Sequence, residues 1–205
     1  GLYEQLVDYE DEWGITRRKN TLGERLASIV KAAREKTGER VVVLIDEYDA
    51  PLNNNIDRDD EFLTALRGEL RSFFGPLKSC GRDIRFSFLT GITRYSQLGI
   101  FSELNNLKNI SMMPEYAGVC GITQEELDTA LRPDVELMAR KMGVSVGVMY
   151  AKLKYMYDGY HMCEESPNIY SPFSLINSLS DGRLNNYWFG SATPTMLVRY
   201  LRKMG

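Results

Sequence analysis

The run Val41–Ile45 restricts most strongly how this chain can fold: five consecutive apolar residues lead directly into Asp46 and Glu47. A short β-branched run without polar alternation predicts a strand buried on both faces, as in the parallel sheets of α/β proteins. Ligands of such sheets bind just beyond the carboxyl ends of the strands. We therefore expect strand 41–46 to be central in its sheet, with the acids where a metal ion or a phosphate would bind. The alternative is a solvated loop after a core strand.

The neighbouring residues predict an α/β arrangement with about three strands. Beyond the first strand we expect, in chain order, a helix at 2–13, a helix at 22–37, a helix at 59–78, a strand at 84–89, a helix at 98–104 and a strand at 107–112. Thr21 and Glu24 form a capping-box pattern at the start of the second helix, Gly38 ends it, and Gly75 with Pro76 should interrupt the third. The buried face of the first helix should carry Leu2, Leu6, Tyr9 and Trp13.

The pattern becomes helical in the second half of the chain. A second capping-box pattern, Thr123 with Glu126, begins a helix at the segment TQEEL, and further helices are expected at 134–142, 145–157, 171–180 and 193–203. The boundary falls within residues 114–122. We therefore divide the chain into an α/β part, 1–117, and a small all-helical part, 118–205.

Composition narrows the class of protein. The net charge of −3 over 205 residues gives no sign of a basic nucleic-acid-binding surface. The three cysteines, Cys80, Cys120 and Cys163, are widely spaced and odd in number, which favours reduced core thiols in a cytoplasmic protein over disulfides or a zinc site. No apolar stretch is long enough to cross a membrane, so no membrane partner is expected.

Seven segments in one order carry a family resemblance. They are VVVLIDEYDAPL, IRFSFLTGITRYS, FSELNNLKNISM, CGITQEEL, YDGYHM, YSPFSLINSL and WFGSATPTMLV. Together they resemble the predicted AAA-ATPase-like family of bacteria, over nearly the whole chain from about residue 20 onward. Members have a P-loop NTPase domain that is usually followed by a nuclease-like domain of the PD-(D/E)XK class.

The resemblance implies roles for five residues in binding and hydrolysing Mg²⁺-ATP. Asp46 and Glu47 resemble a Walker B motif, in which the Asp helps to hold Mg²⁺ and the nucleotide while the Glu polarises the attacking water. The strand at 84–89 resembles the sensor-1 strand, so Thr90 is expected to contact the nucleotide and Thr93 to orient the water. Arg94 is expected to counter phosphate charge, with a surface ion pair as the alternative.

One part of the family pattern is missing. A phosphate cradle needs GxxxxGK[ST], and these 205 residues contain no Gly-Lys pair. We therefore expect an internal part of a longer bacterial protein, without its P-loop strand and without the nuclease-like domain through which nucleic acid would bind. The isolated chain should be inactive towards ATP. Its unpaired sheet edge favours self-association into a homo-oligomer.

Other interpretations remain open at this point. One is a non-catalytic binding or regulatory module, and another is a metal-dependent nuclease that uses Asp46, Glu47 and Asp49. Outside the nuclease hypothesis, Asp49 is interpreted as a turn residue before Pro51 rather than as a partner of the site. His161, the only histidine, is assigned a packing or turn role. Core packing is also favoured over base stacking for the aromatic side chains Tyr157, Tyr160, Tyr170, Phe173 and Trp188.

Overall fold

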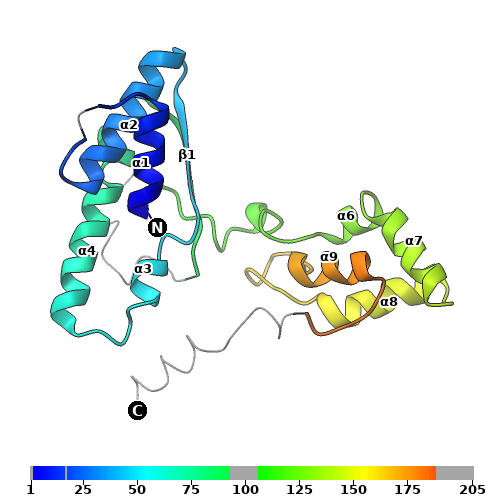
Figure 1. Cartoon of the computed structure of the whole chain (residues 1–205). Helices are drawn as coiled ribbons and strands as arrows, with labels where there is room; N and C mark the ends of the chain where they lie inside the picture. The colour runs from blue at the N-terminus through cyan, green and yellow to red at the C-terminus, as the bar shows by residue number, and fades with distance from the viewer. Residues whose placement is uncertain (1, 17, 93–105, 188–205) are drawn as a thin grey trace. The chain divides into compact units, whose positions relative to one another are not determined.

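The computed structural model describes residues 2–16, 18–92 and 106–187 (Figure 1). They fall in two compact units that divide between Lys108 and Asn109. Each unit has a hydrophobic core of its own. The predicted helices at 98–104 and 193–203 lie outside the described residues.

The N-terminal unit combines helices with a small parallel sheet. Its elements are α1 (Leu2–Glu12), α2 (Leu22–Thr37), β1 (Val41–Ile45), α3 (Ala50–Asn53), α4 (Asp60–Phe74), α5 (Pro76–Ser79) and β2 (Ile84–Leu89). The helix α2 contacts α1, α4, α5 and β1, so it is the central helix of this unit (Figure 1). The mixed α/β class predicted from the sequence is confirmed.

Local signals set the ends of these helices. The Thr21 side chain accepts a hydrogen bond from the Glu24 N–H, and the Glu24 carboxylate accepts one from Thr21 N, so the predicted capping box is formed. Gly38 ends α2 at φ 73°, a left-handed conformation that costs glycine little. The break predicted at Gly75 and Pro76 separates α4 from α5.

The sheet differs from the prediction in the number of its strands and in the burial of their side chains. Within the described residues it has two parallel strands, so β1 is an edge strand rather than a central one. Val43 is buried, whereas Val42 and Leu44 are 50% and 69% exposed, so burial on both faces was a wrong prediction. Because side chains alternate along a strand, helix α2 covers only one face. Phe86, paired with Val42, is also exposed on the other face.

The third strand predicted at 107–112 is not formed. Residues 107–110 have no regular structure, and a turn follows, closed by a hydrogen bond from Met113 N to the carbonyl oxygen of Ile110. A strand needs a partner for its backbone groups, and the described residues supply none beside this segment.

A buried ion pair fixes α1 on α2. Glu10 and Arg25 are 0% and 2% exposed, and two hydrogen bonds of 2.7 and 2.6 Å join the guanidinium to the carboxylate. Tyr9, predicted to face inward, is 52% exposed instead. The helix is therefore turned so that Leu6 and Glu10, one turn apart, face the core.

The C-terminal unit is helical in its described part. It contains a short 3₁₀-helix (Pro114–Tyr116), α6 (Gln124–Asp128), α7 (Arg132–Lys141), α8 (Val146–Tyr157) and α9 (Pro172–Asp181). The second capping box, Thr123 with Glu126, is formed as predicted. Two isolated antiparallel bridges, Ile122 with Tyr170 and Tyr160 with Ile169, connect the loops that the all-helical prediction left irregular.

The aromatic residues of this unit divide between core and surface. Tyr157 and Tyr170 are buried as predicted, whereas Tyr160 and Phe173 are exposed, and Trp188 lies outside the described residues. The Tyr157 hydroxyl donates to the carbonyl oxygen of Asn185 over 2.8 Å. These contacts support packing for the buried rings.

His161 forms two contacts within the loop before α9. Its Nδ1 lies 2.7 Å from the Asn168 side-chain oxygen and its Nε2 lies 3.2 Å from the Glu164 carbonyl oxygen. Two oxygen acceptors favour the doubly protonated ring, and the Asn168 contact makes the larger contribution to raising the pKa of His161. The structure thus gives the histidine a turn-stabilising contact.

Two further features of the fold are the burial of the cysteines and the length of the helices. All three cysteines are free, but only Cys80 is buried; Cys120 is exposed and Cys163 is half-buried, so the prediction of core thiols holds for Cys80 alone. Among the helices of the described ranges, none has the length and apolar character needed to cross a bilayer.

Candidate functional site

The candidate site lies where β1 and β2 end. Ile45 pairs with Leu89 as the last residues of the two parallel strands, and Thr90 N donates a 2.9 Å hydrogen bond to the Ile45 carbonyl oxygen. Asp46 and Thr90 therefore follow paired residues at the same edge of the sheet, which is where α/β sheets bind ligands.

Asp46 and Thr90 contact each other directly. The Thr90 hydroxyl donates to Oδ1 of Asp46, and the Glu47 N–H donates to the same oxygen over 3.0 Å. The Asp46 side chain is exposed, and its Oδ2 has no hydrogen-bond partner within the described residues. One oxygen is thus fixed by the protein while the other can accept a ligand.

Glu47 has an unusual backbone conformation. Its φ is 50°, and among the described residues it is the one non-glycine with a positive φ. A left-handed conformation costs an L-residue about 1–2 kcal/mol, and such strain clusters at functional sites. Hydrogen bonds on both sides hold it: the Glu47 carbonyl oxygen accepts from Ala50 N at 2.9 Å, and Tyr48 N donates to the Thr90 carbonyl oxygen at 3.0 Å. The Glu47 side chain remains exposed.

Asp49, which follows β1, is hydrogen-bonded to the segment that follows β2. It is 1% exposed, and its Oδ2 accepts hydrogen bonds from Ile92 N at 3.0 Å and from Asn53 Nδ2 at 2.9 Å. Burial, and next the charge of Asp49, raises the pKa of the Tyr48 hydroxyl. Asp49 does precede the helix that contains Pro51, as a turn residue would. The contact with Ile92, which lies 43 residues away, was not predictable from the sequence pattern.

The structure brings together three of the five predicted site residues, Asp46, Glu47 and Thr90. Thr93 and Arg94 lie outside the described residues. Within residues 2–16, 18–92 and 106–187, no three His, Cys, Asp or Glu side chains are grouped so that they could hold a metal ion. A metal bound here would need ligands beyond these side chains.

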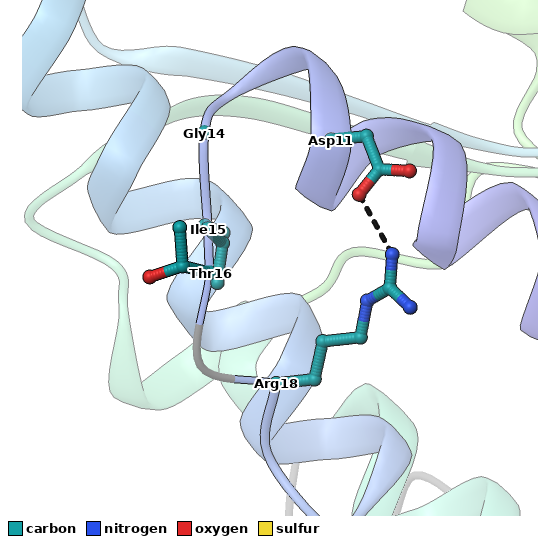
Figure 2. Close-up of a pocket in the computed structure, with 5 residues that line it drawn as sticks. All are labelled: Asp11, Gly14, Ile15, Thr16 and Arg18. Carbon is teal, nitrogen blue, oxygen red and sulfur yellow. Dashed lines mark hydrogen bonds and ion pairs between the residues drawn. The ribbon is translucent and has the colours of Figure 1, made fainter.

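A separate hollow opens where α1 ends (Figure 2). Its lining residues are Asp11, Gly14, Ile15, Thr16 and Arg18. Arg18 reaches Oδ1 of Asp11 over 2.7 Å and Oε2 of Glu10 over 3.0 Å, so its guanidinium is already paired with carboxylates. The hollow contains none of the predicted site residues, and its ion pairs support a structural role at the end of the helix.

Comparisons with known proteins found a family model and a relative that are similar to the chain. The family model described as predicted AAA-ATPase matches residues 2–101. The chain is 33% identical over 202 residues to an uncharacterized protein in the vnfD 5′ region of Azotobacter chroococcum mcd 1. This match covers 98% of the chain but only 36% of that relative. No solved structure matches the chain.

Proposed function

We propose that this chain, whose residues 2–101 belong to the predicted AAA-ATPase family, forms part of the ATP-hydrolysing site of a longer protein. The observation that supports the proposal best is the contact between Asp46 and Thr90 at the ends of β1 and β2, beside the strained Glu47. A nucleotide site needs an acid for the metal, an acid for the water and a hydroxyl close to the phosphate, and these three residues have that chemistry.

Asp46 would hold Mg²⁺. Mg²⁺ is commonly bound by one or two carboxylates, with phosphate and water oxygens as its remaining ligands. The single exposed carboxylate oxygen of Asp46 fits this mode, and it needs no cluster of three protein ligands. Bound Mg²⁺ would neutralise charge on the phosphate oxygens. Thr90 fixes the other oxygen of Asp46 and thereby orients the carboxylate.

Glu47 would act as the general base. Its side chain is exposed beside Asp46, while its backbone is hydrogen-bonded at Ala50 and at Asp46. A carboxylate on a fixed backbone can polarise a water molecule with little loss of orientation. Thr93 is proposed to orient that water, and Arg94 to offset charge on the phosphate, on the family resemblance alone.

The phosphate-binding backbone would come from another part of the same protein. The 205 residues contain no GxxxxGK[ST] sequence, and Asp46 and Glu47 alone repel a polyanion such as ATP. The chain spans about a third of the length of the relative that it matches, 36%. The free thiols favour a reducing compartment, so we place this activity in the cytoplasm.

The geometry is less suited to a metal-dependent nuclease. That reaction would need Asp49 as a ligand together with Asp46 and Glu47. Asp49 is buried and already accepts hydrogen bonds from Asn53 and Ile92. Its carboxylate is therefore committed to the fold.

Calorimetry with Mg²⁺-ATP tests the proposal. The complete protein that contains this chain should bind Mg²⁺-ATP, and Asp46→Ala should weaken binding about tenfold or more, because a charge-assisted metal contact is lost. Asp60→Ala, at an exposed position in the first turn of α4, is the matched control and should bind as the wild type does. The isolated 205-residue chain should show no measurable binding. Tight binding by the isolated chain would show that the phosphate site lies elsewhere.

A further inference from the structure

We propose that Asp49 is a positioning residue of this site: its buried carboxylate sets the place of the Thr90–Ile92 turn, and through it the contact between Thr90 and Asp46. The inference rests on the proposed function, because it assigns a task to a residue within the same site. The effect of Asp49 on Asp46 is proposed to pass through the turn, because Asp49 accepts a hydrogen bond from Ile92 N.

The first support is the hydrogen bond between Asp49 and Ile92. Oδ2 of Asp49 accepts from Ile92 N at 3.0 Å and from Asn53 Nδ2 at 2.9 Å. The side chain is 1% exposed, so water does not compete effectively for these donors. An ionised carboxylate is a stronger acceptor than a neutral amide oxygen. The start of α3 and the end of β2 are thus tied to a single oxygen atom.

The second support is the close packing at Gly91. A Cβ at this position would lie 2.6 Å from Oδ1 of Asp49 and 2.7 and 2.8 Å from ring atoms of Tyr48. A larger side chain fits only if the Asp49 carboxylate and the Tyr48 ring, or the turn itself, move. Asp49 therefore contacts the turn both by a hydrogen bond to Ile92 and by direct packing against Gly91.

The third support is the connection from the turn to the site. Tyr48 N donates to the Thr90 carbonyl oxygen at 3.0 Å, and the Thr90 hydroxyl donates to Asp46. When the turn shifts, Thr90 moves with it, and Asp46 loses one of the two donors that orient its carboxylate. Loss of Asp49 should therefore disturb the site without removing any group that contacts the nucleotide.

Hydrogen exchange on the complete protein tests the structural half of the inference. In Asp49→Ala, the Ile92 amide should exchange at least about tenfold faster, since its buried acceptor is gone, while amides of β1 keep their protection. Asp59→Ala is the matched control: Asp59 caps α4 by accepting from Phe62 N at 2.8 Å, and this hydrogen bond lies within the first turn of that helix. The control should leave Ile92 protection unchanged. Unchanged protection at Ile92 in Asp49→Ala would overturn the inference.

Steady-state kinetics tests the functional half. Asp49→Ala should lower kcat by about 10- to 100-fold, because a small misplacement near the reacting groups can cost about 100-fold in rate. It should also raise the KM for ATP, because the shifted turn moves Thr90 and with it the carboxylate of Asp46. Asp49→Asn keeps an oxygen acceptor and should recover part of kcat. Gly91→Ala moves the turn from the other side and should lower kcat as well. Asp59→Ala should leave kcat unchanged among the folded molecules.

The outcomes separate the inference from the proposed function. When Glu47→Gln hydrolyses ATP at the wild-type rate, the proposed function fails, whatever Asp49 does. When Glu47→Gln is inactive but Asp49→Ala keeps its kcat, the proposed function stands and the positioning role fails. A loss of kcat in Asp49→Ala that Asp49→Asn does not relieve at all, together with an unchanged Ile92 amide, also overturns the positioning role.

Discussion

Removing the carboxylate of Glu10 should destabilise the N-terminal unit strongly. Arg25 would then remain buried, at 2% exposure, without the two hydrogen bonds of 2.6 and 2.7 Å that now neutralise it. Breaking a buried pair from one side typically costs about 3–5 kcal/mol, because the remaining charge is uncompensated. The contact of Arg25 with the Tyr3 ring, at 4.3 Å, persists and recovers only about 0.5–2 kcal/mol. We therefore expect Glu10→Ala to lower the free energy of unfolding by about 3 kcal/mol.

The pH dependence of the wild type should follow from the same pair. The hydrogen bond from Arg25 lowers the pKa of Glu10 below its ordinary value of 4.5, against the opposing effect of burial. A lowered folded-state pKa means that the pair stabilises the protein above pH 4.5 and that this stability is lost as the pH falls through the folded-state pKa. The difference between wild type and Glu10→Ala should shrink over that acidic range.

Urea unfolding followed by Trp13 fluorescence measures these effects, in a Trp188→Phe background so that Trp13 alone reports on the N-terminal unit. The double variant Glu10→Met with Arg25→Met is the control: replacing a buried ion pair by apolar side chains is often neutral or stabilising. A loss below about 1 kcal/mol in Glu10→Ala, the level of an exposed pair, would refute the argument from burial.

Three further predictions concern packing, pH and association. Gly23→Ala should lower the free energy of unfolding by about 1–3 kcal/mol, because its Cβ would collide with a backbone oxygen of α4. Gly68→Ala has open space around it and should instead raise the free energy of unfolding by a few tenths of a kcal/mol. Equal effects of the two variants in urea unfolding would contradict this reasoning. The pKa of His161, measured by NMR titration, should exceed 6.5. The stabilising contacts of His161 are then fully present below pH 6.5 and are lost as the pH rises through the raised pKa. A pKa at or below 6.5 would be inconsistent with two hydrogen-bond acceptors at the ring. Light scattering should show that the isolated 23.4 kDa chain self-associates through its exposed sheet. Changing the exposed Leu44 and Phe86 to Lys should reduce this self-association. A monomeric wild-type chain would argue against an exposed sheet that associates.

The helix ends were predictable from the sequence, because they depend on residues that are neighbours in the chain. Both capping boxes and the break at Gly75 are formed as expected, because a helix end is decided within one turn of chain. The strand at 84–89 is confirmed, and its parallel pairing with β1 brings Asp46 and Thr90 together.

The wrong predictions concern partners distant in the sequence. The run Val41–Ile45 cannot reveal whether a second layer covers it, so the exposure of Val42 and Leu44 was missed. Leu107–Met112 has a plausible strand pattern but lacks a partner strand in the described residues. The burial of Glu10 was not predicted, because its partner, Arg25, lies 15 residues away.

The roles assigned within the site depend on the family resemblance as well as on the geometry. The sequence pointed to Asp46 and Glu47 through their place after an apolar run, and the left-handed backbone of Glu47 became visible only in the structure. Asp49 illustrates the limit most clearly: its contact with Ile92 spans 43 residues, and a short polar residue before Pro51 gives no signal of it.

The most direct test of the account is ATP turnover by Glu47→Gln in the complete protein, with Mg²⁺-ATP binding measured on the same preparation. Glu61→Gln, an exposed glutamate in the first turn of α4, is the matched control. We expect wild-type binding by Glu47→Gln with turnover lower by about 100- to 10,000-fold, the usual contribution of a general base, and a fully active Glu61→Gln. Hydrolysis by Glu47→Gln at the wild-type rate would contradict the proposed role of Glu47.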